Sequence, residues 1–160
     1  MKFYTSYFYQ VRFFTPNMIP ISTAKWDPKW FHDFQDNKYV FLDKRGVCNG
    51  LRADPFVLGE EYWKNLEESH NECTKDCPHD SNNCEFMKSY YNYLNTLDFD
   101  NIKARCENLA LRIQNKMGFK EEPIIVLLVH EKADCPCAER PVIWRWFRDH
   151  NVEITEWSKK

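Results

Sequence analysis

The run PIIVLLVHE, residues 123–131, constrains the fold of this chain more than any other stretch. Its apolar residues are continuous rather than alternating, and many are β-branched, which is typical of a strand that is buried on both faces. Such a strand needs helices on both sides of its sheet. The run therefore predicts an α/β fold with a mainly parallel sheet flanked by helices.

Amphipathic patterns before and after this run predict the covering helices. Apolar residues recur at helical spacing after Asp98 or Asp100, and Gly118 is suited to end that helix. An earlier helix is expected to follow residues 80–81, and a later one lies around residues 142–147. A helix between parallel strands implies a right-handed crossover.

Shorter segments predict the rest of the sheet. Residues 2–11 are aromatic on both faces, as expected of a covered strand. Extended segments are also predicted over residues 18–26, 38–46 and 151–157, and a short helix is expected to open at Asp27 and Pro28.

The size and charge of the chain limit its organisation. Its 160 residues predict a single domain over 1–160. The formal net charge of -2 gives no broad positive field for non-specific nucleic-acid binding. No apolar stretch approaches the length of a membrane-spanning helix. Seven cysteines, in a chain without an export signal, suit reduced thiols or metal ligands better than a disulfide framework. We expect a soluble cytoplasmic protein.

Periodicity fails over residues 47–83, which we interpret as a loop insertion within the domain, braced by metal. Its segment HNECTKDCPHDSNNC holds three cysteines and two histidines, and zinc is the metal that such ligands favour. The predicted zinc ligands are Cys73, Cys77, Cys84 and His79. The spacing matches no standard finger, so the fourth ligand stays open among His70, His79, Cys48, Cys135 and Cys137. An iron-sulfur cluster and surface thiols without metal are the alternatives.

The turn after the central strand, residues 130–140, is predicted to carry the functional site. Ligands of open α/β sheets bind beyond the carboxyl ends of the strands, where helix N-termini supply free N–H groups. The candidate catalytic residues are Glu131, as a general base or metal ligand, and Cys135 and Cys137, as a nucleophile or zinc ligands. The spacing to Arg140 does not fit a phosphatase loop. Alternatively, the acids cap the helix and the cysteines are ordinary thiols.

Four side chains are the candidate ligand-binding residues: Arg12, Arg52, Glu139 and Arg140. The three arginines would form an anion pocket if their segments meet at one edge of the sheet. In the alternative interpretation each arginine pairs with a local acid such as Asp54.

The chain resembles the domain-of-unknown-function 488 proteins of bacteria and their viruses. The resemblance is carried by FYTSYF, PISTAKWDPKWF, CEFMKSYYNYLNTLDF and IIVLLVHEKADCPCAERPVIWRWFRDHNVEITEW. That family has a hydrophobic strand, an acid and then Cys-His-Arg at the start of a helix; Arg140 matches the arginine, whereas Glu139 and Ala138 stand in place of the histidine and cysteine. The resemblance implies an α/β fold, a site at this strand end, and a role in nucleotide or nucleic-acid metabolism.

The predicted function is therefore binding of a phosphate-bearing ligand, a nucleotide or a nucleic-acid end, with a structural zinc site. Whether the ligand is also chemically changed stays open. The alternative is a non-enzymatic module that binds a small ligand or a protein and is braced by zinc.

Overall fold

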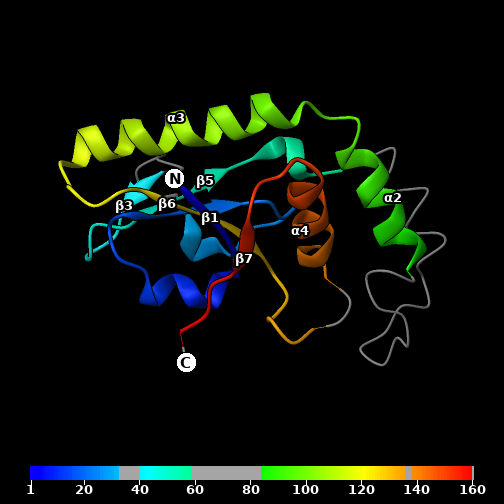
Figure 1. The fold of residues 1–160 in the computed structure, drawn as a ribbon. Helices are drawn as coiled ribbons and strands as arrows, with labels where there is room; N and C mark the ends of the chain where they lie inside the picture. The colour runs from blue at the N-terminus through cyan, green and yellow to red at the C-terminus, as the bar shows by residue number, and fades with distance from the viewer. Residues whose placement is uncertain (33–39, 59–83, 136–137, 160) are drawn as a thin grey trace.

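The computed structural model describes residues 1–32, 40–58, 84–135 and 138–159. Five strands form one sheet in the order β5-β2-β6-β1-β7, and every pair in it is parallel. This arrangement confirms the predicted α/β fold (Figure 1). The strands are β1 Lys2–Tyr7, β2 Met18–Ser22, β5 Leu51–Arg52, β6 Ile124–Val129 and β7 Ile154–Glu156.

Strand β6 lies at the centre of this sheet and pairs with both β1 and β2. Residues 125–129 are fully buried, as the continuous apolar run predicts. Their side chains alternate between two cores, with Ile125 and Leu127 on one side and Val126 and Leu128 on the other.

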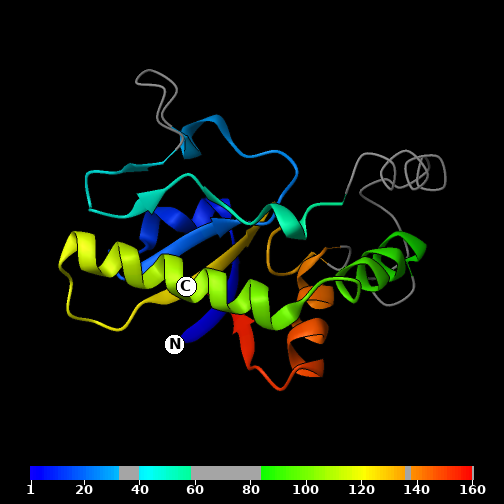
Figure 2. The same ribbon diagram turned by 90° about the horizontal axis from the view of Figure 1, so that it is seen from above.

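The first core lies under two helices, α3 Phe99–Met117 and α4 Arg140–Asp149. Helix α3 runs across one face of the sheet in Figures 1 and 2. Both of its predicted ends are confirmed. Asp98 accepts a hydrogen bond from the N–H of Asn101 at 3.0 Å, and Gly118 adopts a positive φ of 75° at the end. A third helix, α2 Glu85–Leu94, packs against α4.

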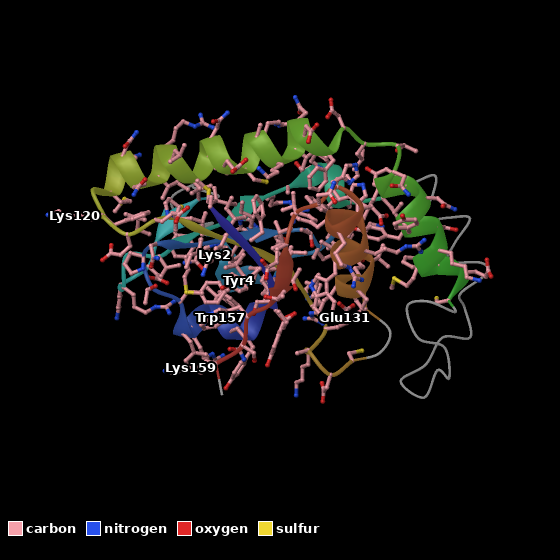
Figure 3. The ribbon with its side chains drawn as sticks, viewed as in Figure 1. Lys2, Tyr4, Lys120, Glu131, Trp157 and Lys159 are labelled. Carbon is pink, nitrogen blue, oxygen red and sulfur yellow. The ribbon has the colours of Figure 1, made fainter. Side chains whose placement is uncertain are left out.

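The second core lies under two 3-10 helices, η1 Phe8–Phe13 and η2 Lys29–Phe31. Figure 1 shows η1 on the side of the sheet opposite α3. Tyr4 and Trp157, labelled in Figure 3, pack against this second core. A small antiparallel hairpin of β3 Phe41–Leu42 and β4 Cys48–Asn49 lies beside the main sheet.

The described part of the 47–83 segment contains three short elements. They are β4, the edge strand β5 and the 3-10 helix η3 Asp54–Phe56. Residues 59–83 lie outside the described residues, and so do the predicted zinc ligands Cys73, Cys77 and His79. Cys84 is described and directly precedes α2. None of the described helices is long and apolar enough to cross a bilayer.

Candidate functional site

The connection from β6 to α4 is braced from inside by Arg140. This first residue of α4 has only 1% of its surface exposed. Its Nη1 donates to the carbonyl of Lys132 at 3.0 Å, its Nη2 donates to the carbonyl of Glu131 at 2.7 Å, and its Nε pairs with the carboxylate of Glu156 on β7. The guanidinium predicted as an anion clamp is therefore engaged inside the protein.

The carboxylate of Glu156 belongs to the same buried network. Its Oε2 also accepts a hydrogen bond from the Thr5 hydroxyl at 3.0 Å, and that hydroxyl accepts one from the indole of Trp144 at 2.7 Å. Burial raises the pKa of Glu156, although Arg140 and Thr5 act against this rise. The network joins β1, β7 and α4, so it supports the end of the sheet rather than an open site.

Glu131 and Glu139 lie at the two ends of the same connection. Figure 3 shows Glu131 just beyond β6, near the base of α4. Glu139 directly precedes α4, and burial together with the charge of Glu131 raises the pKa of Glu139 to about 8. At neutral pH its carboxyl is therefore mostly protonated and able to donate a hydrogen bond. The pKa of the nearby Tyr90 is raised by burial and by Glu139.

The two cysteines of this connection differ in what the structure describes. Cys135 is half-buried, and its backbone N–H donates to the carbonyl of Lys132 at 3.0 Å. Cys137 lies outside the described residues. A nucleophilic role for either thiol stays a prediction.

Arg12 lies on η1 and is exposed. Its Nε donates to the carbonyl of Tyr9 at 3.1 Å, and its guanidinium lies 3.7 Å from the centroid of the Tyr9 ring. Arg12 and Arg52 line two different cavities, which share no residue, and Arg140 lines neither of them. The structure does not bring the three predicted arginines into one pocket.

Arg52 ends β5 and is held in place by two aspartates. Its Nη1 lies 2.7 Å from Asp27, its Nε lies 3.1 Å from Asp54, and its Nη2 donates to the carbonyl of Ala24 at 2.8 Å. The two carboxylates raise the pKa of Arg52, although burial opposes them. Arg52 is thus a fixed positive charge at the carboxyl end of the sheet.

Asp27 is the buried centre of this cluster, with 3% of its side chain exposed. Besides Arg52, it accepts hydrogen bonds from the Ser22 hydroxyl and from Nε2 of His32, the latter at 2.6 Å. Burial alone would raise the pKa of Asp27, but these donors hold it below its ordinary value. A buried carboxylate with three donors is well satisfied and fixes the loop between β2 and η2.

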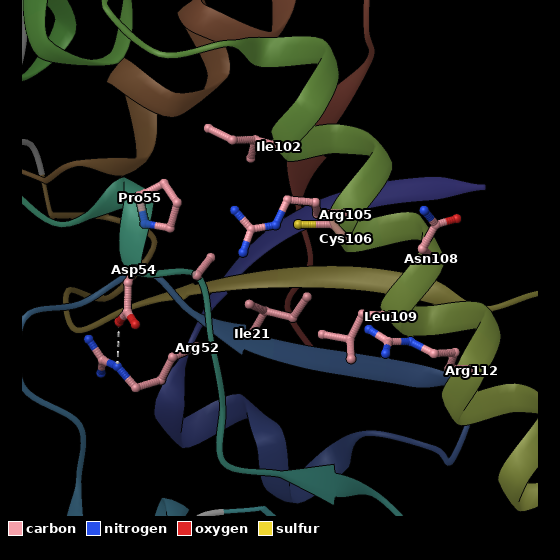
Figure 4. Close-up of a pocket in the computed structure, with 11 residues that line it drawn as sticks. Ile21, Arg52, Asp54, Pro55, Ile102, Arg105, Cys106, Asn108, Leu109 and Arg112 are labelled. Carbon is pink, nitrogen blue, oxygen red and sulfur yellow. Dashed lines mark hydrogen bonds and ion pairs between the residues drawn. The ribbon is translucent and has the colours of Figure 1, made fainter.

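A cleft of about 510 Å³ opens between Arg52 and helix α3 (Figure 4). We call it the arginine cleft, because Arg105 and Arg112 of α3 line one wall and Arg52 belongs to the opposite wall, where its guanidinium points away from α3 toward Asp54. Within the described chain, neither Arg105 nor Arg112 forms an ion pair, whereas Arg52 is paired as above. The lining residues are Ile21, Arg52, Ala53, Asp54, Pro55, Ile102, Arg105, Cys106, Asn108, Leu109 and Arg112.

The sequence prediction included Arg52 but missed the two arginines of α3. Arg105 and Arg112 are seven residues apart, so they lie on the same side of the helix beside its apolar stripe. That spacing was the available signal. The spacing alone could not show that this side of the helix borders a cleft, because the opposite wall is formed by residues 52–55, which are far away in the sequence.

The described cysteines are mostly buried thiols, and none of them forms a disulfide. Burial raises the pKa of Cys48, and it raises the pKa of Cys106 to about 11, so both are protonated at neutral pH. The described residues contain no cluster of three or more side chains that would hold a metal ion. Of the four predicted zinc ligands, Cys84 alone lies within the described ranges, as do the alternative candidates Cys48 and Cys135, and zinc binding stays a prediction.

The chain was also compared with known proteins. No protein-family model, curated protein or solved structure matches it. The similarity to the domain-of-unknown-function 488 proteins stays a prediction from sequence, and the candidate site is defined by its own geometry.

Proposed function

We propose that this protein binds a small phosphate-bearing ligand, a nucleotide or a nucleic-acid end, in the arginine cleft. The observation that carries the proposal is the pair of exposed arginines on the α3 wall of the cleft, with Arg52 on the opposite wall. The pair, Arg105 and Arg112, have no acidic partner among the described residues. A phosphate bound beside Arg105 or Arg112 would accept charge-assisted hydrogen bonds from these groups.

The chemistry of the lining fits a phosphate ester better than a free ion. A guanidinium donates two parallel hydrogen bonds to phosphate oxygens, and Arg105 and Arg112 are exposed and form no ion pair within the described residues. Ile21 and Leu109 provide apolar surface between the charged groups, which suits a sugar or base. The volume of about 510 Å³ lies within the range of small-molecule sites.

Calorimetric titration with nucleoside mono-, di- and triphosphates tests this proposal, with inorganic phosphate and the unphosphorylated nucleosides as comparisons. We expect Arg105→Gln and Arg112→Gln each to weaken phosphate-ester binding about tenfold or more, because each removes a charge-assisted hydrogen bond of about 1.5–3 kcal/mol. Arg148→Gln is the matched control, since Arg148 is exposed on α4 and lies outside the cleft. Equal binding by all three variants would refute the assignment.

The zinc site and the catalytic residues belong to the proposal as separate parts. Metal analysis of protein purified without added metal tests for zinc, and less than about half an equivalent argues against a structural site. Catalytic roles for Glu131, Cys135 and Cys137 predict a thiol that alkylates at unusually low pH. Thiols that react only after chelation would instead favour the non-enzymatic, zinc-braced module. A cytosolic location also stays a prediction from the cysteine pattern.

A further inference from the structure

A second cavity of about 370 Å³ lies in the part of the chain formed by η1, η2 and the β3–β4 hairpin. We call it the aromatic groove. It shares no lining residue with the arginine cleft. Its walls are Phe8, Tyr9, Val11, Arg12, Trp30, Phe41, Asp43, Arg45 and Asn49.

Two large aromatic rings of this groove are open to solvent. Tyr9 is 52% exposed and Trp30 is 51% exposed, and Trp26, close to Trp30 in the chain, is 73% exposed. Trp30 makes edge-on contacts with Phe8 and Phe31, whose ring centroids lie 6.3 and 6.0 Å away. The ring is therefore anchored by the core on one side and presented to solvent on the other. Exposed aromatic rings grouped in this way mark interaction sites.

Cations lie beside these rings. The guanidinium of Arg12 lies 3.7 Å from the Tyr9 centroid, and the ammonium of Lys25 lies 5.6 Å from the Trp26 centroid. Lys29 adjoins Trp30 in the chain and is exposed. The one acid in the lining, Asp43, is bound to Arg45 at 2.7 Å. The groove is therefore both aromatic and positively charged.

The formal charge is distributed unevenly along the chain. Residues 1–58 contain eight Lys or Arg and five Asp or Glu, a formal charge of +3. Residues 59–160 contain fourteen Lys or Arg and nineteen Asp or Glu, a formal charge of -5. The net charge of -2 thus conceals a basic N-terminal part, and the aromatic groove is built entirely from that part.

We propose that the aromatic groove binds single-stranded nucleic acid. Bases stack on Trp30, while Arg12 and Lys29 contact the phosphates. Aromatic platforms interleaved with cations are the arrangement that binds single strands with little sequence preference. We favour nucleic acid over a protein partner because the cations beside the rings match the negative charge of a phosphate backbone. This binding site is independent of the arginine cleft.

Fluorescence anisotropy with labelled oligonucleotides of about twelve nucleotides, both DNA and RNA, tests the proposal at about 50 mM salt. We expect Trp30→Ala to weaken binding about tenfold or more and Trp30→Phe to stay within about threefold of the wild type, because a smaller ring still stacks. Arg12→Gln should reduce the slope of log affinity against log salt by about 0.7, the value for one phosphate contact on a single strand.

Two controls separate this site from general effects. Leu111→Ala removes an exposed apolar side chain from α3 and should leave oligonucleotide binding unchanged. Trp30→Ala should not affect mononucleotide binding in the arginine cleft. Failure of every oligonucleotide to bind at low salt would overturn the proposal and favour a protein partner for the groove. Equal binding by Trp30→Ala and the wild type would overturn it as well.

Discussion

Replacement of Arg140 by methionine should destabilise the fold rather than simply remove a ligand contact. Methionine fills much of the same space, but it leaves the buried carboxylate of Glu156 without its cation and the carbonyls of Glu131 and Lys132 without their donors. Removal of one partner from a buried ion pair costs about 3–5 kcal/mol. A domain of ordinary stability has only about 5–15 kcal/mol to lose. We therefore expect a fall in the midpoint of thermal unfolding of roughly 10 °C.

Urea unfolding followed by circular dichroism measures this loss directly. The double variant Arg140→Met, Glu156→Gln should recover part of the stability, because no unpaired charge then remains buried. Arg148→Met is the matched control on the exposed side of the same helix and should change the free energy of unfolding by less than about 0.5 kcal/mol. If Arg140→Met retained stability to within about 1 kcal/mol and lost nucleotide binding instead, the reasoning would be refuted.

Three further changes test other features of the structure. Gly118→Ala should lower the free energy of unfolding by about 1 kcal/mol, because position 118 has a positive φ and open space around it, so the cost is conformational alone. The pKa of Asp27 is lowered in the folded protein, so its contribution to stability is present above about pH 4 and is lost as the pH falls through the folded-state pKa. Asp27→Asn should therefore make the free energy of unfolding depend less on pH between about pH 2 and pH 6, as measured by urea unfolding. The pKa of Glu139 is raised to about 8, so the wild type should lose stability as the pH rises from the ordinary glutamate pKa toward 8. Glu139→Gln should be more stable than the wild type at about pH 8, with a smaller difference at about pH 5, and a difference that does not depend on pH would contradict the raised pKa.

Long patterns in the sequence were sufficient to predict the main layers of the fold. The apolar run of β6 and the stripe of α3 each extend over enough residues to distinguish strand from helix. Strands β3, β4 and β5 have two residues each, and a strand of that length has no detectable period. Residues 8–11 continue the aromatic pattern of β1, but the chain turns there into η1, whose Phe8 and Val11 are buried in the second core.

The candidate site was harder to predict than the fold, because side-chain exposure depends on contacts between distant residues. Arg140 was correctly located at the start of a helix beyond β6. Its burial could not be predicted, because its ion-pair partner Glu156 lies on β7, a strand that comes later in the chain. Arg52 was correctly located near Asp54, but its strongest partner, Asp27, comes from a separate loop. Trp26 and Trp30, on either side of Pro28, are both exposed, and their exposure likewise depends on the tertiary packing around them.

The position of β6 between β1 and β2 has a consequence for folding kinetics. Lys2 pairs with Ile124 and Met18 also pairs with Ile124, so two strands made early in synthesis remain without a common partner until β6 has been made. The sheet therefore has a high contact order, and folds of this kind complete slowly because a long chain segment must close before its contacts form. During that interval the apolar edges of β1 and β2 are exposed, and nascent chains that stop before β6 should be prone to aggregation.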